Sequence, residues 1–190
     1  MRINSIQVLI NETKKCLKNE CNLSALITAL IIPDLCGKIL YPDENNSQRY
    51  KKWFDKYIGN YEQNPFDKEK SKDEQLPYMN GEVIYKLRCA MFHEGSDDIS
   101  SKISIDEFNL QFGKSSVLES ASISQRIDPL PNGTKIIHPK VVKWNINTYQ
   151  ICEKLIKAAE LFLKLEAGDL SKIPTINILP DASDVFKIKK

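Results

Sequence analysis

Arg88 and His93 are the two residues of this 190-residue chain whose types and spacing most clearly suggest chemistry. An imidazole exchanges protons near neutral pH and can serve as a general acid or base. A guanidinium binds phosphate or carboxylate oxygens through a planar fork of N–H donors. The two residues are five positions apart in a segment with helical periodicity, so their side chains are the first candidates for a site.

The helix that carries this pair is predicted to have Asn80 as its N-cap and Gly95 as its C-terminal cap. In a regular α-helix, residues five apart differ by about 140° around the axis and about 7.5 Å along it. Arg88 and His93 therefore do not converge on one substrate group within an ideal helix. Joint chemistry requires that the helix loosens near Phe92, or that a second copy of the chain brings its own pair alongside.

The same helix is apolar on two sides, which favours either a central place in a bundle or a seam between two copies of the chain. One face contains Val83, Ile84, Leu87, Ala90 and Met91, and the opposite face contains Tyr85, Cys89 and Phe92.

A structural role for the pair is the alternative. Arg88 would then form an ion pair with a carboxylate, and His93 would interact with the negative end of the helix dipole. The bare spacing does not distinguish this role from catalysis.

Four other segments have the apolar spacing of helices. The aromatic stripe of the third, formed by Tyr50, Trp53, Phe54 and Tyr57, is typical of a core and not of a ligand site. The polar stretch 60–77 is predicted to be a solvated loop. The four segments are Ile6–Leu17 with Ser5 as N-cap, Leu23–Leu40 interrupted by Pro33, Ser47–Ile58 ended by Gly59, and a last helix from Asn147 to Gly168.

Between the helix with Arg88 and the last helix, residues 102–146 alternate in the manner of strands, with a bulge near Asp106, a turn at 131–133 and a break at Pro139. The predicted fold class is therefore mainly α: four to five helices with a small antiparallel β insert at about 102–146 before the last helix. Residues 1–168 form one domain, and 169–190 form an extended or frayed tail.

The composition is that of a globular protein, with 42% hydrophobic and 27% charged residues and a net charge of +2. Such a small net charge provides no strong field for nucleic acid or membrane, so any nucleic-acid binding must be local. The local candidates are Arg49, Lys52 and Lys56 beside the aromatic stripe. A solvated helix face explains these three cations equally well.

The chain contains five cysteines without a Cys-x-x-Cys pair, and only two histidines, which gives no ligand set for zinc and predicts no cofactor. Scattered reduced thiols are typical of the cytoplasm. The longest apolar run, Leu23–Ile32, is shorter than the roughly 20 residues of a membrane span. We therefore expect a cytoplasmic protein that is neither secreted nor membrane-spanning.

The run from Tyr85 to Gly95 contains Arg88-Cys89-Ala90-Met91-Phe92-His93, which matches the R-x4-6-H motif of the HEPN superfamily. With the strings at 33–37 and 49–54, the chain resembles a bacterial branch of HEPN-like proteins over about residues 22–98, and over the last helix by analogy. HEPN domains are all-helical, and many are metal-independent endoribonucleases of toxin, phage-defence and RNA-processing systems.

The resemblance implies a homodimeric HEPN-like bundle in which two motifs face each other across an RNA cleft. His93 would act as general acid or base on the 2′-hydroxyl or the leaving oxygen, and Arg88 would bind the scissile phosphate. Asp34 is the candidate for a supporting acidic residue on an earlier helix. Cys89 stands where many active members have Asn, Asp or His.

The resemblance also implies partners and an alternative function. The partners are RNA, a second copy of the chain and a protein antitoxin or regulator. The alternative function is a non-catalytic HEPN-like module that binds RNA, a nucleotide or a protein.

Overall fold

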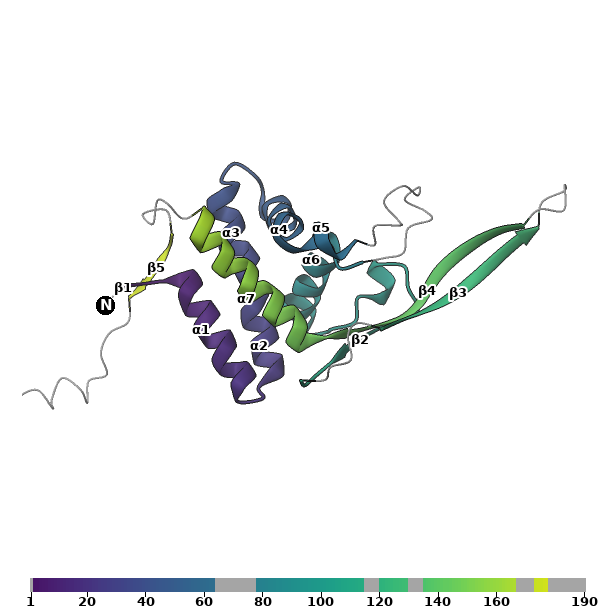
Figure 1. The fold of residues 1–190 in the computed structure, drawn as a ribbon, viewed down its shortest axis with the longest axis horizontal. Helices are drawn as coiled ribbons and strands as arrows, with labels where there is room; N and C mark the ends of the chain where they lie inside the picture. The colour runs from purple at the N-terminus through teal and green to yellow at the C-terminus, as the bar shows by residue number, and fades with distance from the viewer. Residues whose placement is uncertain (1, 64–77, 115–119, 130–134, 167–172, 178–190) are drawn as a thin grey trace, which may run out of the picture.

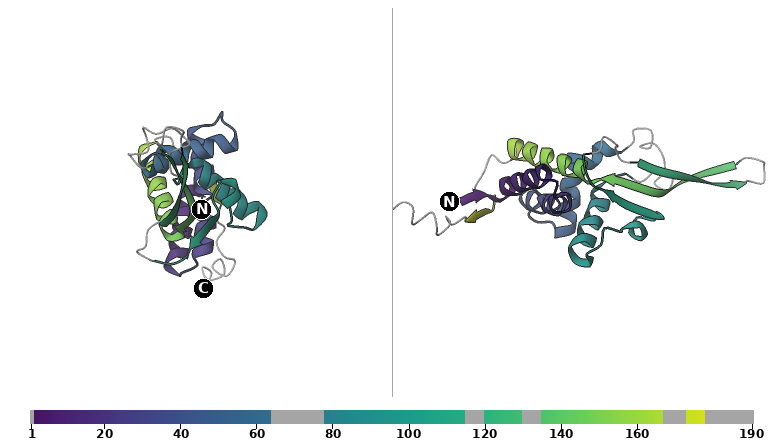
Figure 2. Two further views of the ribbon diagram at one scale, coloured as in Figure 1. Left: turned by 90° about the vertical axis from the view of Figure 1, so that its right-hand side faces the viewer. Right: turned by 90° about the horizontal axis from the view of Figure 1, so that it is seen from below.

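The computed structural model describes residues 2–63, 78–114, 120–129, 135–166 and 173–177 (Figure 1). The described part is mainly helical with a small three-stranded sheet, as the sequence predicts. Figures 1 and 2 show a bundle of helices from which a two-stranded ribbon projects. The main elements are β1 (Arg2–Asn4), α1 (Ser5–Lys18), α2 (Asn22–Ala29), α3 (Ile32–Leu40), α4 (Asn46–Phe54), α5 (Asn60–Glu62), α6 (Gly81–Cys89), β2 (Glu107–Gln111), β3 (Ser120–Pro129), β4 (Lys135–Asn147), α7 (Thr148–Leu165) and β5 (Thr175–Asn177). The remaining helical segments are the π-helices η1 (Asp55–Gly59) and η3 (Ala90–Glu94) and the 3₁₀-helix η4 (Ser100–Lys102).

Asparagine side chains cap four of the helices, because their amide oxygens accept backbone N–H groups that the first turn leaves unpaired. The caps predicted at Asn80 and Asn147 are confirmed. Helix α1 is capped by Asn4 and not by the predicted Ser5, and α4 is capped by Asn45.

The predicted interruption at Pro33 is confirmed. The apolar segment divides into α2 and α3, and Pro33 lies in the first turn of α3, where a missing N–H costs no helical hydrogen bond.

By length and composition alone, the stretch Asn22–Leu40 is long and apolar enough to cross a membrane. The core helix of a globular domain meets the same criterion. Here the stretch comprises α2 and α3, whose buried residues include Leu26, Ile32 and Cys36 and pack against α1, α4 and α7.

Gly59 does not end the third predicted helix, contrary to the expectation from sequence. Helix α4 widens into η1 and continues through Gly59 into α5. A Cβ at position 59 would lie 2.3 Å from Asp55 Oδ1. The missing side chain therefore makes room for the Asp55 carboxylate, which accepts a hydrogen bond from the Gly81 backbone N–H at 2.6 Å.

The aromatic stripe of α4 and η1 belongs to the core, as predicted. Tyr50, Trp53 and Phe54 are fully buried, and Tyr57 is partly buried against them. Phe162 of α7 packs edge-on against the rings of Trp53 and Tyr57. These rings join α4 to the longest helix of the bundle.

Helix α4 lies unusually close to both α3 and α6. A Cβ at Gly37 of α3 would lie 2.6 Å from the Arg49 carbonyl oxygen, and one at Gly81 of α6 would lie 2.5 Å from the Lys51 carbonyl oxygen. Only glycine fits at either contact, so these two positions set the spacing of three helices.

The sheet has the order β2-β4-β3 and corrects the prediction of an antiparallel insert. Strands β3 and β4 are antiparallel, but β2 is parallel to β4, with Glu107 opposite Lys143. The bulge lies at Ser122 and Ile123 and not near Asp106. The strand predicted at Ile103–Ile105 is absent, since these residues follow η4 in a turn.

Pro139 does not break β4, contrary to the prediction. The β2–β4 pairing spans only 143–147, so Pro139 lies in the two-stranded part of the sheet, where one side of β4 needs no donor. The predicted turn at 131–133 lies outside the described residues.

Part of the predicted tail is extended and paired. Strand β5 pairs antiparallel with β1, and Ser5 donates from its backbone N–H and its hydroxyl to the Pro174 carbonyl, at 3.0 and 2.8 Å. Residues 64–77 of the predicted loop and residues 169–172 and 178–190 of the predicted tail lie outside the described residues.

Gly37→Ala should destabilise the fold by about 1–3 kcal/mol, because the added methyl group meets backbone and not a movable side chain. Urea denaturation followed by circular dichroism measures the loss. Lys38→Ala changes the exposed neighbour on the same helix and serves as the control. Equal stability of the two variants would contradict the close α3–α4 contact.

Asp55→Asn should stabilise the protein increasingly as the pH rises. Burial raises the pKa of Asp55 above its ordinary value. The folded state therefore binds this proton more readily than the unfolded state, and stability is lost as the pH rises from about 4 through the folded pKa. Asparagine keeps the acceptor for Gly81 without the charge. Melting temperatures of the variant and the unaltered protein, measured between acid and neutral pH, test this. Asp43→Asn, at an exposed position, is the control. A difference in melting temperature between Asp55→Asn and the unaltered protein that stays constant with pH would contradict the prediction.

Candidate active site

Arg88, in the last turn of α6, connects the two other residues that the sequence singled out. Its Nε and Nη2 atoms donate to Asp34 Oδ2 at 3.3 and 3.1 Å, and its Nη1 lies 3.2 Å from His93 Nε2. Asp34 lies in the first turn of α3. Residues that are 54 and five positions apart in the sequence thus form one cluster, which we call the Asp34–Arg88–His93 site.

A π-helical turn brings His93 next to Arg88. After Cys89 the helix widens into η3, and the Gly95 N–H donates to the Ala90 carbonyl, five residues earlier. A π-turn places residues five apart on nearly the same side of the helix. Of the two routes that the sequence left open, loosening near Phe92 is the one observed, and the pair meets within a single chain.

Gly95 ends this segment as predicted. It has a φ of 63°, a left-handed conformation that glycine adopts without the steric cost of a Cβ. The Ser96 N–H also bonds to the Ala90 carbonyl, at 3.2 Å.

The contact between Arg88 and His93 assigns a hydrogen-bonding role to one ring nitrogen. A guanidinium only donates hydrogen bonds, so in this contact His93 Nε2 is the acceptor and the ring proton is assigned to Nδ1. An unprotonated Nε2 is the form in which a histidine removes a proton from a substrate hydroxyl.

Arg88 remains charged in this partly buried place. Burial acts against its positive charge, but the Asp34 carboxylate outweighs burial, and the pKa of Arg88 is raised. The Phe92 ring also lies under the guanidinium, with its centroid 5.2 Å from Cζ. Phe92 is 40% exposed and His93 is exposed, so the cluster opens to solvent.

Tyr50 forms the floor beneath the cluster. It is fully buried, its hydroxyl donates to the Leu30 carbonyl at 3.1 Å, and its ring packs against Tyr85 with centroids 5.3 Å apart. Burial raises the pKa of Tyr50 well above its ordinary value, and the nearby Asp34 adds to this. Tyr50 is thus a neutral support and not a proton carrier at physiological pH.

Cys89 lies at the side of the site, partly buried. Burial first, and then a hydrogen bond with Cys89, raises the pKa of Tyr85. The thiol thus interacts with the hydroxyl of the tyrosine whose ring packs on Tyr50, and it also contributes to the raised pKa of Arg88.

The predicted RNA-binding cations are not part of this cluster. Lys52 pairs with Glu44, and Lys56 pairs with Glu166 at 2.7 Å. Arg49 is partly buried, and its Nε has no hydrogen-bond partner among the described residues. Their role in RNA binding stays a prediction.

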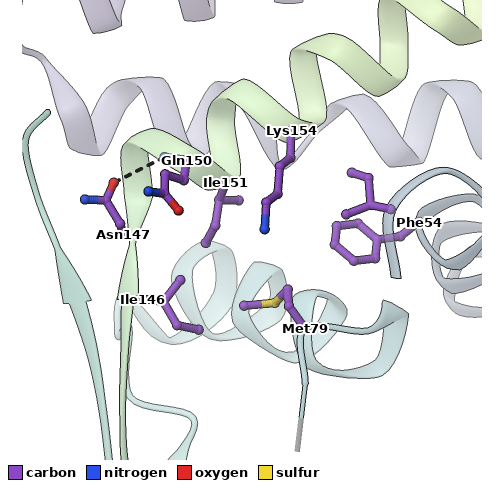
Figure 3. Close-up of a pocket in the computed structure, with 8 residues that line it drawn as sticks. Phe54, Met79, Ile146, Asn147, Gln150, Ile151 and Lys154 are labelled. Carbon is purple, nitrogen blue, oxygen red and sulfur yellow. Dashed lines mark hydrogen bonds between the residues drawn. The ribbon is translucent and has the colours of Figure 1, made fainter. Parts of the chain in front are cut away.

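A small cavity and a larger hollow lie in different parts of the described structure. The cavity in Figure 3, between Phe54, Met79 and the start of α7, measures about 20 Å³, the size of a single water molecule. Lys154 reaches into it and pairs with Glu62 at 2.6 Å. It is too small for a nucleotide.

A larger hollow of about 390 Å³ borders η3, the segment that carries His93. It is lined by Leu23, Ile27, Met91, Gly95, Ser96, Asp97, Leu110 and Phe112. Within the described ranges, no three His, Cys, Asp or Glu side chains gather in a way that could hold a metal ion.

Sequence reasoning did not assign Phe92 or Tyr50 to the site. Tyr50 was correctly expected in the core, and only the fold shows that this core position lies under Asp34. The aromatic residue directly before His93 was the available signal for Phe92. No protein-family model, no curated protein and no solved structure matches this chain.

The contact with Arg88 predicts the tautomer of His93. The ¹⁵N shifts of the two imidazoles should show His93 with its proton on Nδ1, because Arg88 occupies Nε2. Arg88→Gln should remove this preference. Lys86→Gln is the control and should keep it, because Lys86 is a basic residue of the same helix that does not contact His93. A proton on Nε2 in the unaltered protein would contradict the observed contact.

Proposed function

We propose that this protein is a metal-independent endoribonuclease of HEPN type, related to toxin or defence systems, that acts as a homodimer. The observation that carries the proposal is the Asp34–Arg88–His93 site, in which an unprotonated imidazole nitrogen lies 3.2 Å from a fixed guanidinium at the surface. The resemblance to the R-x4-6-H motif supports the same reading.

In this proposal, His93 Nε2 takes the proton of an RNA 2′-hydroxyl. The 2′-oxygen attacks the neighbouring phosphorus, the bond to the 5′-oxygen breaks, and a 2′,3′-cyclic phosphate forms. His93 of the partner subunit, in its protonated form, donates a proton to the leaving 5′-oxygen. No metal takes part in these steps.

Arg88 has the task of binding the scissile phosphate. A phosphate oxygen takes the place of His93 Nε2 as the acceptor from Nη1, and Nη1 then stabilises the charge that develops on the phosphate. Asp34 is a positioning residue, because it holds Nε and Nη2 of the same guanidinium and so keeps the donor plane in place.

The ion pair between Arg88 and Asp34 also favours a second candidate function. A guanidinium that shares its charge with a carboxylate stabilises the charge of a transition state less, but its N–H groups still donate hydrogen bonds to a bound phosphate or carboxylate. The chain would then be a non-catalytic HEPN-like module that binds RNA, a nucleotide or a protein.

His93→Ala and Arg88→Ala should each reduce RNA cleavage by about 10²–10³-fold, because one removes the proton acceptor and the other the phosphate ligand. End-labelled RNA in EDTA, with products separated on a denaturing gel, measures the rates. Asp34→Asn should reduce them less, with its main effect on the orientation of Arg88.

Glu94→Gln, on the same π-turn, is the matched control and should cleave at nearly the unaltered rate. Circular dichroism and sedimentation show whether each variant keeps its fold and its oligomeric state. Unaltered protein that leaves all RNA intact in EDTA would overturn the nuclease, and RNA binding without cleavage would favour the second function.

A further inference from the structure

The β3–β4 ribbon extends beyond the body that carries the site. Strand β2 covers only the 143–147 part of β4, and the remainder of β3 and β4 projects away from the helices as a two-stranded ribbon (Figures 1 and 2). Two strands alone are marginally stable in water. A projecting ribbon of this length therefore calls for a functional explanation.

The register of the ribbon separates its residues into two faces, since successive strand positions alternate. One face, which we call the basic face, is supported at its base by Asn145 Nδ2, which donates to Ser120 Oγ at 3.1 Å. The other face, which we call the apolar face, is mostly apolar. The cross-strand pairs of the basic face are Ser120 with Asn145, Ser122 with Lys143, Ser124 with Lys140, Arg126 with His138 and Asp128 with Ile136; those of the apolar face are Ala121 with Trp144, Ile123 with Val141, Gln125 with Pro139, Ile127 with Ile137 and Pro129 with Lys135.

Burial separates the two faces on β4 at the base of the ribbon. Trp144 and Val141 of the apolar face are buried there, whereas Lys143 and Asn145 of the basic face are half-buried. On β3, residues 120–124 are exposed on both faces, so the basic face is open to solvent where the ribbon joins the body.

The ribbon also carries the positive charge of the chain. Residues 120–147 contain four basic residues and one acidic residue, a net charge of +3, whereas the whole chain has +2. The rest of the chain is therefore slightly negative. Three of the four basic residues, Arg126, Lys140 and Lys143, and the acidic residue Asp128 occupy positions of the basic face, which leaves that face with a net charge of +2. Lys143 also pairs with Glu107 of β2 at 2.8 Å.

The groups of the basic face are ligands for phosphate. Hydroxyl, ammonium and guanidinium donors make most protein contacts to nucleic-acid backbones. Serine positions recur every second residue along β3, about 6.8 Å apart. A repeating series of this kind suits a polyanion with regularly spaced charges better than a single phosphate.

The base of the ribbon is connected to the helix that carries Arg88. Lys86 of α6 donates to the Lys102 carbonyl at 2.7 Å, and the Asp106 N–H donates to the Val142 carbonyl, at the bulge of β4, at 3.1 Å. A strand bound along the ribbon would thus lead toward the side of the body where α6 lies.

We propose that the basic face of the β3–β4 ribbon binds the sugar–phosphate backbone of single-stranded RNA and directs it to the Asp34–Arg88–His93 site. A single strand fits better than a duplex, because the major groove of duplex RNA is too deep and narrow for side chains to enter. The choice of RNA as the polyanion rests on the proposed function, and the binding surface itself rests on register and charge.

Fluorescence anisotropy with labelled oligouridine tests the surface, in a His93→Ala background so that no cleavage interferes. Arg126→Ala combined with Lys140→Ala should weaken binding about tenfold and reduce the slope of log affinity against log salt by about 1.4, the loss of two phosphate contacts on a single strand. Lys135→Ala is the matched control, since it removes one charge from the other face of the same ribbon and should change affinity by less than about twofold.

The charge-conserving variant Arg126→Lys with Lys140→Arg should keep most of the affinity, which separates loss of charge from loss of fold. Equal losses in Lys135→Ala and the double alanine variant, or no loss in either, would overturn the ribbon surface. The ribbon surface would also be overturned if the double alanine variant bound RNA normally and changed only the oligomeric state. Binding through the ribbon by a protein that never cleaves RNA would overturn the proposed function and leave this inference standing.

Discussion

The packing of α4 against α3 and α6 is the constraint on which the site depends. Both contacts are backbone to backbone, with Arg49 against Gly37 and Lys51 against Gly81. Asp34 lies about one turn before Gly37, and Arg88 lies about two turns after Gly81. The distance between the Asp34 carboxylate and the Arg88 guanidinium is therefore set by where three helix backbones touch. Tyr50, next to Arg49, is fully buried, and its hydroxyl donates to the Leu30 carbonyl, so the core is closed on this side of the ion pair.

The widened turns of the chain occur where polar groups need a geometry that a regular helix does not give. In η1, the extra width accompanies the Asp55 carboxylate, which holds the Gly81 N–H at the start of α6. In η3, it brings His93 next to Arg88. The start of α6 and the end of its continuation are thus both fixed by polar contacts, and Arg88 lies between them. Local π-turns inside helices are frequent at functional sites, and η3 is consistent with that tendency.

The sequence predicts those parts of the fold that depend on neighbours in the chain. Asn80, Asn147, Pro33 and Gly95 act through their own backbone or through the next turn, and each lies where predicted. The failures involve distant partners. From sequence, Gly59 looks like the end of a helix, because the sequence does not show that a side chain there would clash with the Asp55 carboxylate. Pro139 looks like the end of a strand, because the sequence does not show that β2 pairs with β4 only over 143–147. The parallel pairing of β2 with β4 and the ion pair between Asp34 and Arg88 join segments dozens of residues apart, which periodicity does not report.

Charge balance explains why a site of this kind would need the ribbon. Arg88 and Asp34 neutralise each other, and His93 Nε2 accepts from Arg88, so the ion pair adds no net charge to the cluster. A neutral ion pair exerts little attraction on a polyanion at a distance, because dipolar fields fade faster than the field of a net charge and salt screens the remainder within about 10 Å. The ribbon, at +3, is the part of the chain with a field to attract RNA. In the proposed scheme the two tasks are therefore separate. The ribbon gathers the strand, and the cluster acts only on the phosphate that displaces Arg88 from His93.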